Sequence, residues 1–238
     1  MTLPRDSRLF ALVPGAGVGA RMNAPLPKQY LTLQGRTLAE HTLGRLLALP
    51  RIEQVMVAIA EDDPWWPALP VASRPRVATV TGGESRAHSV LNGLDALLEK
   101  ATADDWVLVH DMARPCVRPS DIERLIDSSD ASGAILALPV SDTLKRAEDQ
   151  RISATVPRES IWRALTPQLF PIGALRDAIA KALADNVTVT DEASAMEYIG
   201  WQPLLVQGQA DNIKVTLAED LALADFFLQR QKGLTSDV

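Results

Sequence analysis

The sequence predicts an α/β fold in which a mostly parallel sheet is covered by helices on both faces. Two observations support this prediction. Short apolar runs of strand length alternate with longer segments of helical period along most of the chain. The chain of 238 residues also shows no evident linker or internal repeat, so we expect one domain over residues 1–238.

The predicted elements follow one another in regular order. Strands are expected at residues 9–13, 55–60, 76–80, 106–110, 134–140 and 204–207. Helices are expected at residues 37–49, 85–98, 119–129, 172–184, 192–199 and 218–231. In a sheet of this kind, ligands bind at the carboxyl ends of the strands, which is where the candidate motifs described below lie.

Residues 141–158 interrupt the alternation. Residues 143–146 and 152–156 have the composition of two strands, and residues 147–151 form a polar turn between them. No helical segment accompanies this hairpin, and two strands alone are marginally stable in water. We therefore expect a protruding β-arm that packs on a second copy of the protein.

Composition limits the functions that the chain can have. The formal net charge is −6, so we expect no general attraction to nucleic acid or to an anionic membrane, and an anionic substrate needs a local cluster of cations. Cys116 is the one cysteine, which excludes an internal disulfide and a cysteine-rich zinc site. With no apolar stretch typical of a leader or a membrane span, we expect a cytoplasmic protein.

The first predicted strand leads into a glycine-rich segment with two cations after it. The segment contains Pro14, Gly15, Ala16, Gly17 and Gly19, and Arg21 and Lys28 follow. Glycines let the backbone approach a phosphate closely, and the two cations supply the charge to hold it. The segment predicts binding of a nucleoside triphosphate and chemistry on its phosphates.

Three alternatives compete for this segment. Gly15, Gly17 and Ala20 match the dinucleotide fingerprint, but the acids that end the next strand, Glu61 and Asp62, come too late to hold a ribose. The kinase-type phosphate loop is absent, because no Gly-Lys-Ser or Gly-Lys-Thr occurs. A glycine-rich turn with incidental surface cations is the third alternative.

A second motif follows the strand that ends at residue 80. Gly83, Glu84 and Ser89 lie where that strand turns into a helix. Backbone amides exposed by glycine, together with short polar side chains, can read a nucleotide base beside the first loop. The alternative is an ordinary capped helix.

A third motif is at the end of the most apolar strand, where Asp111 is followed by Arg114. A carboxylate at this position faces the ligand crevice and can offer an oxygen to a Mg²⁺ ion that bridges triphosphate oxygens. The arginine can grip a second phosphate with two hydrogen bonds. A structural ion pair between the two residues is the alternative.

Further polar residues are spread over the C-terminal half. They are Arg158, Thr166 within residues 162–168, Thr190 within residues 190–193, and Lys214 within residues 211–216. We interpret these segments as turns or strand ends that present side chains to a ligand. Thr190 and Asp191 are also good helix caps, and capping is the expected role of one of them.

Taken together, the motifs resemble those of the 2-C-methyl-D-erythritol 4-phosphate cytidylyltransferase family. They read P-G-A-G-V-G-A-R-M with P-K-Q-Y, T-G-G-x-x-R-x-x-S-V, V-H-D-x-A-R-P, W-R-A-L-T-P-Q, T-D-E-A-S-A and D-N-I-K-V-T, in this order over nearly the whole chain. The resemblance implies a three-layer, Rossmann-like nucleotidyltransferase fold and a homodimer joined by the β-arm. It also implies that CTP and methylerythritol phosphate give 4-diphosphocytidyl-2-C-methyl-D-erythritol and pyrophosphate, with Mg²⁺, in the non-mevalonate isoprenoid pathway.

The resemblance also assigns roles to the candidate residues. It implies that the glycine loop, Gly83, Glu84 and Ser89 bind CTP, and that Arg21 and Lys28 stabilise the charge that develops on the phosphates. The residues implied to hold methylerythritol phosphate are Asp111, Arg114, Thr143, Arg158, Thr166, Thr190 and Lys214. Arg158 and Lys214 would align its phosphate, and exchange of the arm would bring Thr143 and Arg158 from the neighbouring subunit.

Two residues depart from the family pattern. Gly15 and Met112 each stand where alanine is expected, which predicts a pocket floor that is looser at one place and tighter at another. Two other functions stay open: a cytidylyltransferase for another polyol phosphate, such as ribitol 5-phosphate, and a non-catalytic nucleotide-binding module.

Overall fold

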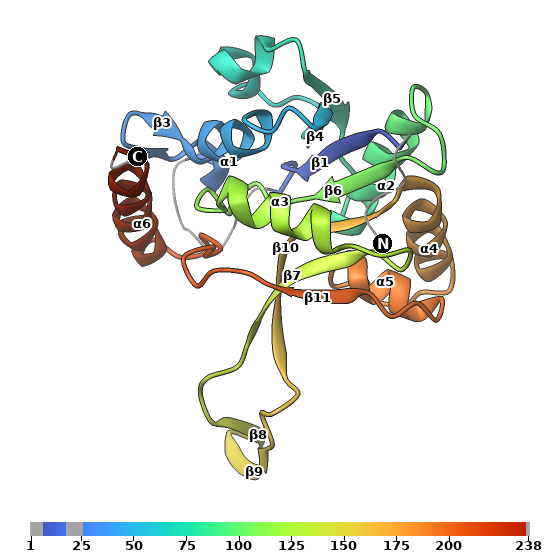
Figure 1. Cartoon of the computed structure of the whole chain (residues 1–238), viewed down its shortest axis with the longest axis vertical. Helices are drawn as coiled ribbons and strands as arrows, with labels where there is room; N and C mark the ends of the chain where they lie inside the picture. The colour runs from blue at the N-terminus through green and yellow to red at the C-terminus, as the bar shows by residue number, and fades with distance from the viewer. Residues whose placement is uncertain (1–6, 18–25, 237–238) are drawn as a thin grey trace.

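The computed structural model describes residues 7–17 and 26–236, and the side chains up to residue 233. Gly19 and Arg21, two of the predicted site residues, lie outside the described residues. The expected α/β architecture is confirmed: a central sheet carries helices on both faces (Figure 1).

The central sheet has seven strands in the order β11-β7-β10-β6-β1-β4-β5. Their bounds are β1 Leu9–Pro14, β4 Ile52–Ile59, β5 Val77–Thr81, β6 Trp106–Val109, β7 Ala134–Pro139, β10 Trp162–Pro171 and β11 Leu204–Gln207. Neighbouring strands pair in parallel except at β10, which is antiparallel to both β6 and β7. The sheet is therefore mostly parallel, as predicted.

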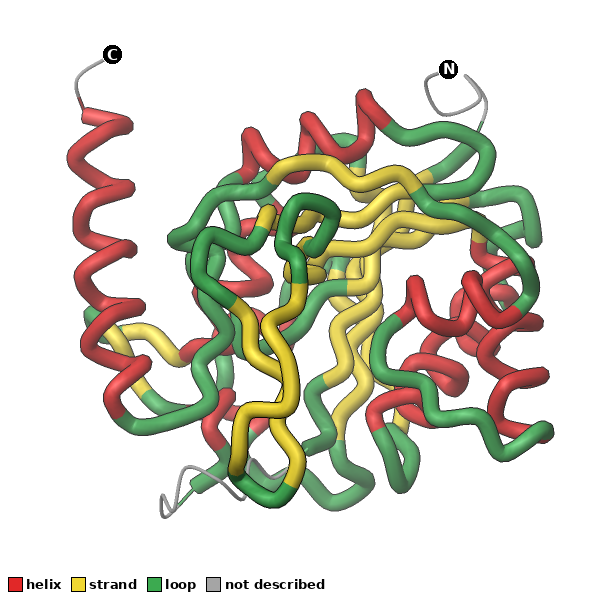
Figure 2. Tube along the Cα trace, turned by 90° about the horizontal axis from the view of Figure 1, so that it is seen from below, coloured by secondary structure: helices red, strands yellow, loops and turns green. Residues whose placement is uncertain are grey.

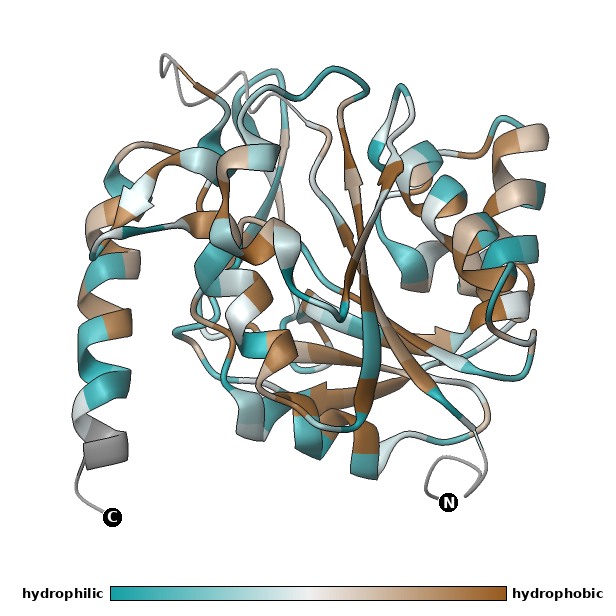
Figure 3. Cartoon of the chain, turned by 90° about the horizontal axis from the view of Figure 1, so that it is seen from above, coloured by the Kyte–Doolittle hydropathy of each residue, from teal (hydrophilic) through white to brown (hydrophobic). Residues whose placement is uncertain are grey.

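The helices form a layer on each face of the sheet (Figure 2). One apolar core packs helices α1 Leu38–Leu47 and α3 Pro119–Ser128 against the sheet. A second core lies under α2 Arg86–Leu98, α4 Ile172–Ala184 and α5 Glu192–Tyr198. Figure 3 shows the strands between these layers as predominantly hydrophobic, as expected where both faces of a sheet are buried.

The C-terminal helix α6, Glu219–Ser236, lies at one side of the molecule (Figure 1). A third, smaller core joins its residues Ala224 and Leu228 to Leu38 and Val215. Val215 follows the predicted site residue Lys214, so α6 supports the loop that carries this lysine.

Short elements complete the chain. They are the hairpin β2 Thr32–Leu33 and β3 Arg36–Thr37, and the 3-10 turns η2 Lys28–Tyr30, η3 Trp66–Ala68 and η4 Pro70–Ser73. At the start of α1, Thr37 and Glu40 form a reciprocal capping box, which satisfies amides that a helix end leaves unpaired.

Residues 162–168, which the sequence analysis interprets as a turn or a strand end, belong to strand β10, a strand that it did not predict. Two prolines, Pro167 and Pro171, obscured the strand in the sequence, since proline cannot donate to a ladder. The structure accommodates Pro167 where the pairing with β7 is irregular, between Ala164 and Gln168.

The hairpin is confirmed and protrudes from the body of the protein (Figure 1). It consists of β8 Leu144–Glu148 and β9 Arg151–Val156. Its turn is shorter than predicted: Asp149 and Gln150, with φ angles of 47° and 63°, connect the strands. Positive φ at two central residues is typical of the tight turns that suit twisted strands. Ile152 on the arm is 69% exposed, an apolar side chain with little cover from its own chain.

Candidate functional site

A cavity of about 530 Å³ opens beside the residues that follow strands β1, β5 and β6. The predicted residues on its wall are Pro14, Gly15, Ala16, Gly17, Lys28, Gly83, Glu84, Ser89, Asp111 and Lys214. A second hollow of about 560 Å³ lies between α1 and η4 and contains none of them. The position of the predicted residues, and not volume, identifies the first cavity as the candidate site.

Gln29 holds the described part of the glycine loop. Its buried side chain donates hydrogen bonds from Nε2 to the carbonyl oxygens of Gly15, at 2.8 Å, and Gly17, at 3.3 Å. The amide of Gly15 donates to the carbonyl of Ala58 at 2.7 Å. The loop is thus fixed to the sheet on one side and to the turn that carries Lys28 on the other.

Lys28 and Lys214, two of the three described cations of the predicted catalytic set, meet at this cavity, whereas Arg158 is absent from its wall. Lys28 Nζ donates to the carbonyl of Val215 at 3.0 Å, next to Lys214 in the chain. Lys214 Nζ lies 2.8 Å from Asp111 Oδ2. Lys214 is in an irregular loop between β11 and α6. The convergence of Lys28 and Lys214 from positions 186 residues apart (214 − 28) is the arrangement that binding of a polyanion requires.

Asp111 is surrounded by positive charge. Arg86 Nε lies 3.0 Å from Oδ1, and Arg114 Nε lies 3.6 Å from Oδ2 in addition to Lys214. Burial acts to raise the pKa of Asp111, but the charges of Arg86 and Lys214 outweigh it and hold this pKa well below its usual range. Asp111 is therefore ionised at neutral pH and holds the side chains of Arg86, Arg114 and Lys214 in position.

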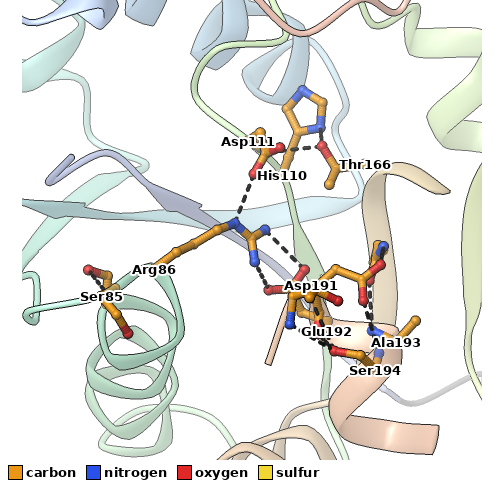
Figure 4. A network of polar contacts seen from close by, with 12 residues as sticks. Ser85, Arg86, His110, Asp111, Thr166, Asp191, Glu192, Ala193 and Ser194 are labelled. Carbon is orange, nitrogen blue, oxygen red and sulfur yellow. Dashed lines mark hydrogen bonds and ion pairs between the residues drawn. The ribbon is translucent and has the colours of Figure 1, made fainter. Parts of the chain in front are cut away.

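Arg86 is a residue of the site that the sequence analysis did not select. It begins α2, lines the cavity, and contacts Asp111 together with Glu192 (Figure 4). Although burial alone lowers the pKa of Arg86, the charges of Glu192 and Asp111 raise it above its ordinary value. The sequence signal was its place in the second motif, T-G-G-x-x-R.

Thr166 supports Asp111 from behind. Its Oγ1 accepts a hydrogen bond from the Asp111 amide at 3.0 Å and lies 2.9 Å from His110 Nδ1. His110 Nε2 lies 3.2 Å from the Arg114 carbonyl, which can only accept, so Nε2 carries the hydrogen and Nδ1 accepts from Thr166. Burial lowers the pKa of His110 to about 4. The Thr166 hydroxyl is thus directed at a neutral histidine.

Arg114 has a structural role beside its approach to Asp111. Its Nη1 donates to the buried carbonyl of Asn212 at 2.8 Å, and Asn212 Nδ2 donates to the Thr166 carbonyl at 2.8 Å. These bonds connect the loop after β6, the strand β10 and the loop that contains Lys214. Arg114 can therefore form the structural ion pair with Asp111 and also have a role in the site.

The predicted base-reading residues differ in exposure. Ser89 is buried, and its Oγ accepts from the Gly83 amide at 3.0 Å, which fixes the turn before α2. Ser85 caps the helix by accepting from the His88 amide. The Glu84 side chain is 83% exposed and lies 3.5 Å from His88 Nε2 at the cavity. The loop is a capped helix start that also faces the cavity.

Three predicted substrate residues, Thr143, Arg158 and Thr190, are exposed and are absent from the described wall of the cavity. Arg158 donates to the carbonyl of Ser141 at the base of the arm. Capping of α5 falls to Asp191, whose side chain accepts from the Ser194 amide. Within one chain, the structure does not bring these three residues to the other site residues.

Over the described part of the chain, no three His, Cys, Asp or Glu side chains gather to hold a metal ion. Asp111 is one carboxylate among cations. Such a carboxylate fits a Mg²⁺ ion whose other ligands are phosphate oxygens and water, and does not fit a metal bound by protein ligands alone.

Comparison with known proteins identifies the family. The family model described as 2-C-methyl-D-erythritol 4-phosphate cytidylyltransferase matches residues 9–230. The chain belongs to this family. It is 54% identical over 227 residues to the enzyme of that name from Vibrio vulnificus strain YJ016, covering 94% of this chain and 96% of the relative. It is 51% identical over 221 residues to the enzyme of that name from Actinobacillus pleuropneumoniae serotype 7, and the match covers 93% of this chain and 96% of the relative.

Solved structures of family members agree. A crystal structure of 4-diphosphocytidyl-2C-methyl-D-erythritol synthase matches with a TM-score of 0.82 and 39% identity, over 94% of this chain and 99% of the other. The Francisella tularensis cytidylyltransferase matches with a TM-score of 0.81 and 35% identity, over 93% and 100%. The resemblance and the nucleotidyltransferase fold inferred from the sequence are confirmed. In the described chain, we find no helix with the length and apolar content needed to span a bilayer.

Proposed function

We propose that this chain transfers the cytidylyl group of CTP to 2-C-methyl-D-erythritol 4-phosphate, in the non-mevalonate isoprenoid pathway. The convergence of Lys28 and Lys214 with the glycine loop on one cavity supports this function most directly, in a family that bears the name of this reaction. A phosphate oxygen of the sugar phosphate attacks the α-phosphorus of CTP. The bond between the α- and β-phosphates breaks, and pyrophosphate leaves with its electron pair.

The residues act on this reaction by position and charge. The attacking oxygen is already an anion, so the reaction needs no general base. Two anionic reactants repel each other, and a protein of net charge −6 brings them together through a local group of cations. Lys28 stabilises charge on the CTP phosphates, and Lys214 orients the sugar phosphate. Arg21 has the same role as Lys28 in this proposal.

Mg²⁺ is the cofactor that we propose, entering with the triphosphate. When bound, the ion neutralises phosphate charge and makes pyrophosphate a better leaving group. Asp111 would offer a carboxylate oxygen to it. We expect a chelator to stop pyrophosphate release and added Mg²⁺ to restore it. Turnover that continues in excess chelator would contradict this part of the proposal.

The decisive assay is release of pyrophosphate from CTP, Mg²⁺ and methylerythritol phosphate, with ribitol 5-phosphate as a second acceptor and Lys28→Ala as the inactive control. We expect fast release with methylerythritol phosphate. Faster release with ribitol 5-phosphate would assign the chain to another polyol phosphate. Nucleotide binding without turnover on either acceptor would identify a non-catalytic module.

We also propose that the chain acts as a homodimer in which the β-arm of one copy brings Thr143 and Arg158 to the site of the other. Their absence from the described wall of the cavity in their own chain supports this arrangement, as does the protruding arm (Figure 1). The single buried cysteine and the charged substrates support a cytoplasmic location.

Mixing two inactive variants tests the exchange of arms. A dimer of Lys28→Ala with Arg158→Ala has one site in which both residues are native. An equal mixture should regain about a quarter of the wild-type sites, since half of randomly formed dimers are mixed. Mixed dimers that regain no activity would show that Arg158 does not act across the interface.

A further inference from the structure

Glu192 is a buried carboxylate behind the cavity. It is 1% exposed and is the first residue of α5, whose N-terminus is capped by Asp191. Its Oε1 and Oε2 accept from Arg86 Nη1 at 2.7 Å and Nη2 at 3.1 Å (Figure 4). A carboxylate removed from water in this way must be paired, and a guanidinium pairs with it through two parallel hydrogen bonds.

This pairing decides which part of Arg86 faces the site. With Nη1 and Nη2 directed at Glu192, Nε remains to contact Asp111 Oδ1 at 3.0 Å. Oδ2 of Asp111 then meets Lys214 at 2.8 Å. Four charges of alternating sign are thus in contact in series, from α5 to α2, to the end of β6, and to the loop that carries Lys214.

Without the charge of Glu192, the terminal nitrogens of Arg86 would lose their anionic partner. Asp111 is the other carboxylate that Arg86 contacts. A guanidinium that turned to bind both oxygens of Asp111 would take the oxygen that now holds Lys214. The lysine would then lose the contact that places it in the cavity.

We propose that Glu192 is a positioning residue for the cytidylyl transfer, acting through Arg86 and Asp111 on Lys214. This inference rests on the proposed function. It predicts a selective defect: Lys214 orients the sugar phosphate, so loss of the Glu192 charge impairs use of methylerythritol phosphate, while use of CTP through the glycine loop and Lys28 is retained.

The test is Glu192→Gln, which keeps the shape of the side chain and removes its charge. Glu197→Gln is the matched control, because this substitution makes the same chemical change at an exposed position of the same helix. Glu192→Asp is the second variant, since it keeps the charge and shortens the side chain by one carbon. KM for each substrate, kcat and the thermal unfolding midpoint are measured for all of them.

In Glu192→Gln we expect KM for methylerythritol phosphate to rise about tenfold, while KM for CTP stays within about twofold of the wild-type value. In Glu192→Asp we expect KM for methylerythritol phosphate to lie closer to the wild-type value. If Glu192→Gln does not fold, Glu192→Asp must show a smaller rise of the same selectivity. Kinetic values equal to those of Glu197→Gln would overturn the inference, as would an equal rise in both KM values in both Glu192 variants. Wild-type protein that releases no pyrophosphate would instead overturn the proposed function.

Discussion

The methyl group of Met112 occupies the space that a side chain at position 15 would need. A Cβ placed on Gly15 would lie 2.9 Å from Met112 Cε and 3.3 Å from the Ala58 carbonyl oxygen. Both residues line the cavity, and Met112 is buried. The two residues that stand where the sequence analysis expects alanine therefore meet, and the side chain of Met112 fills the space beside Gly15.

Gly15→Ala should raise KM for CTP several-fold, because the added methyl pushes the end of Met112 into the cavity. Gly15→Ala combined with Met112→Ala should bring KM back toward the wild-type value, since the crowding is removed. Steady-state kinetics on both single variants and the double variant check this. Effects of the two substitutions that simply add would contradict the proposed contact.

Lys28→Ala should reduce turnover by a few orders of magnitude, since a lost transition-state donor typically costs about 3 to 4 kcal/mol. We expect the same of Arg21→Ala. The rate of pyrophosphate release at saturating substrates is the measurement, and Lys100→Ala, an exposed lysine absent from the cavity wall, is the control. Near-normal turnover of folded Lys28→Ala would exclude the assigned role.

His110 should make the folded protein less stable in acid. Burial lowers its pKa from 6.5 to about 4. Between these two values the unfolded chain binds a proton that the folded chain does not, so the free energy of unfolding falls as pH falls from 6.5 to 4. The full effect is about 3 kcal/mol. Urea unfolding between pH 7.5 and pH 4 should show that the free energy of unfolding falls more steeply for wild type than for His110→Gln. The same dependence on pH in both proteins would contradict this role of His110.

Cys116 should be inert in the folded protein. Burial raises the pKa of its thiol to about 12, and the thiolate is the form that alkylating reagents attack. Iodoacetamide at neutral pH should leave the native chain unmodified and add one group per chain in denaturant, as read by mass spectrometry. Equal rates of modification in both states would show that the side chain is accessible.

Most of the fold followed from local pattern. The central parallel strands β1 and β6 are buried on both faces and appear in the sequence as continuous apolar runs, such as residues 106–109. Strand β10 was not predicted, because Arg163 and two prolines interrupt the apolar run that marks a buried strand. Its first residue, Trp162, pairs with Pro139, 23 residues away, and its last, Pro171, pairs with Trp106, 65 residues away.

The site was predicted where motifs are contiguous and missed where contacts are long-range. Lys28, Asp111 and Lys214, which the structure brings to one cavity, were selected because they lie in turns and loops after strands. Arg86 and Glu192 are 106 residues apart and were not selected, since each alone has the sequence context of a helix start. Their partnership exists only after α2 and α5 pack on the same face of the sheet.

Strand β10 begins at Trp162, near the base of the hairpin, and ends at Pro171 in the middle of the sheet, with Thr166 between. Only residues 157–161 separate the hairpin from the strand whose Thr166 hydroxyl supports Asp111. If a second copy holds the hairpin as proposed, it also restrains, through this short connection, the strand that supports Asp111 in the chain that extends the arm. Catalysis by each copy would then depend on how firmly its own arm is held, and dilution would slow turnover as the copies separate.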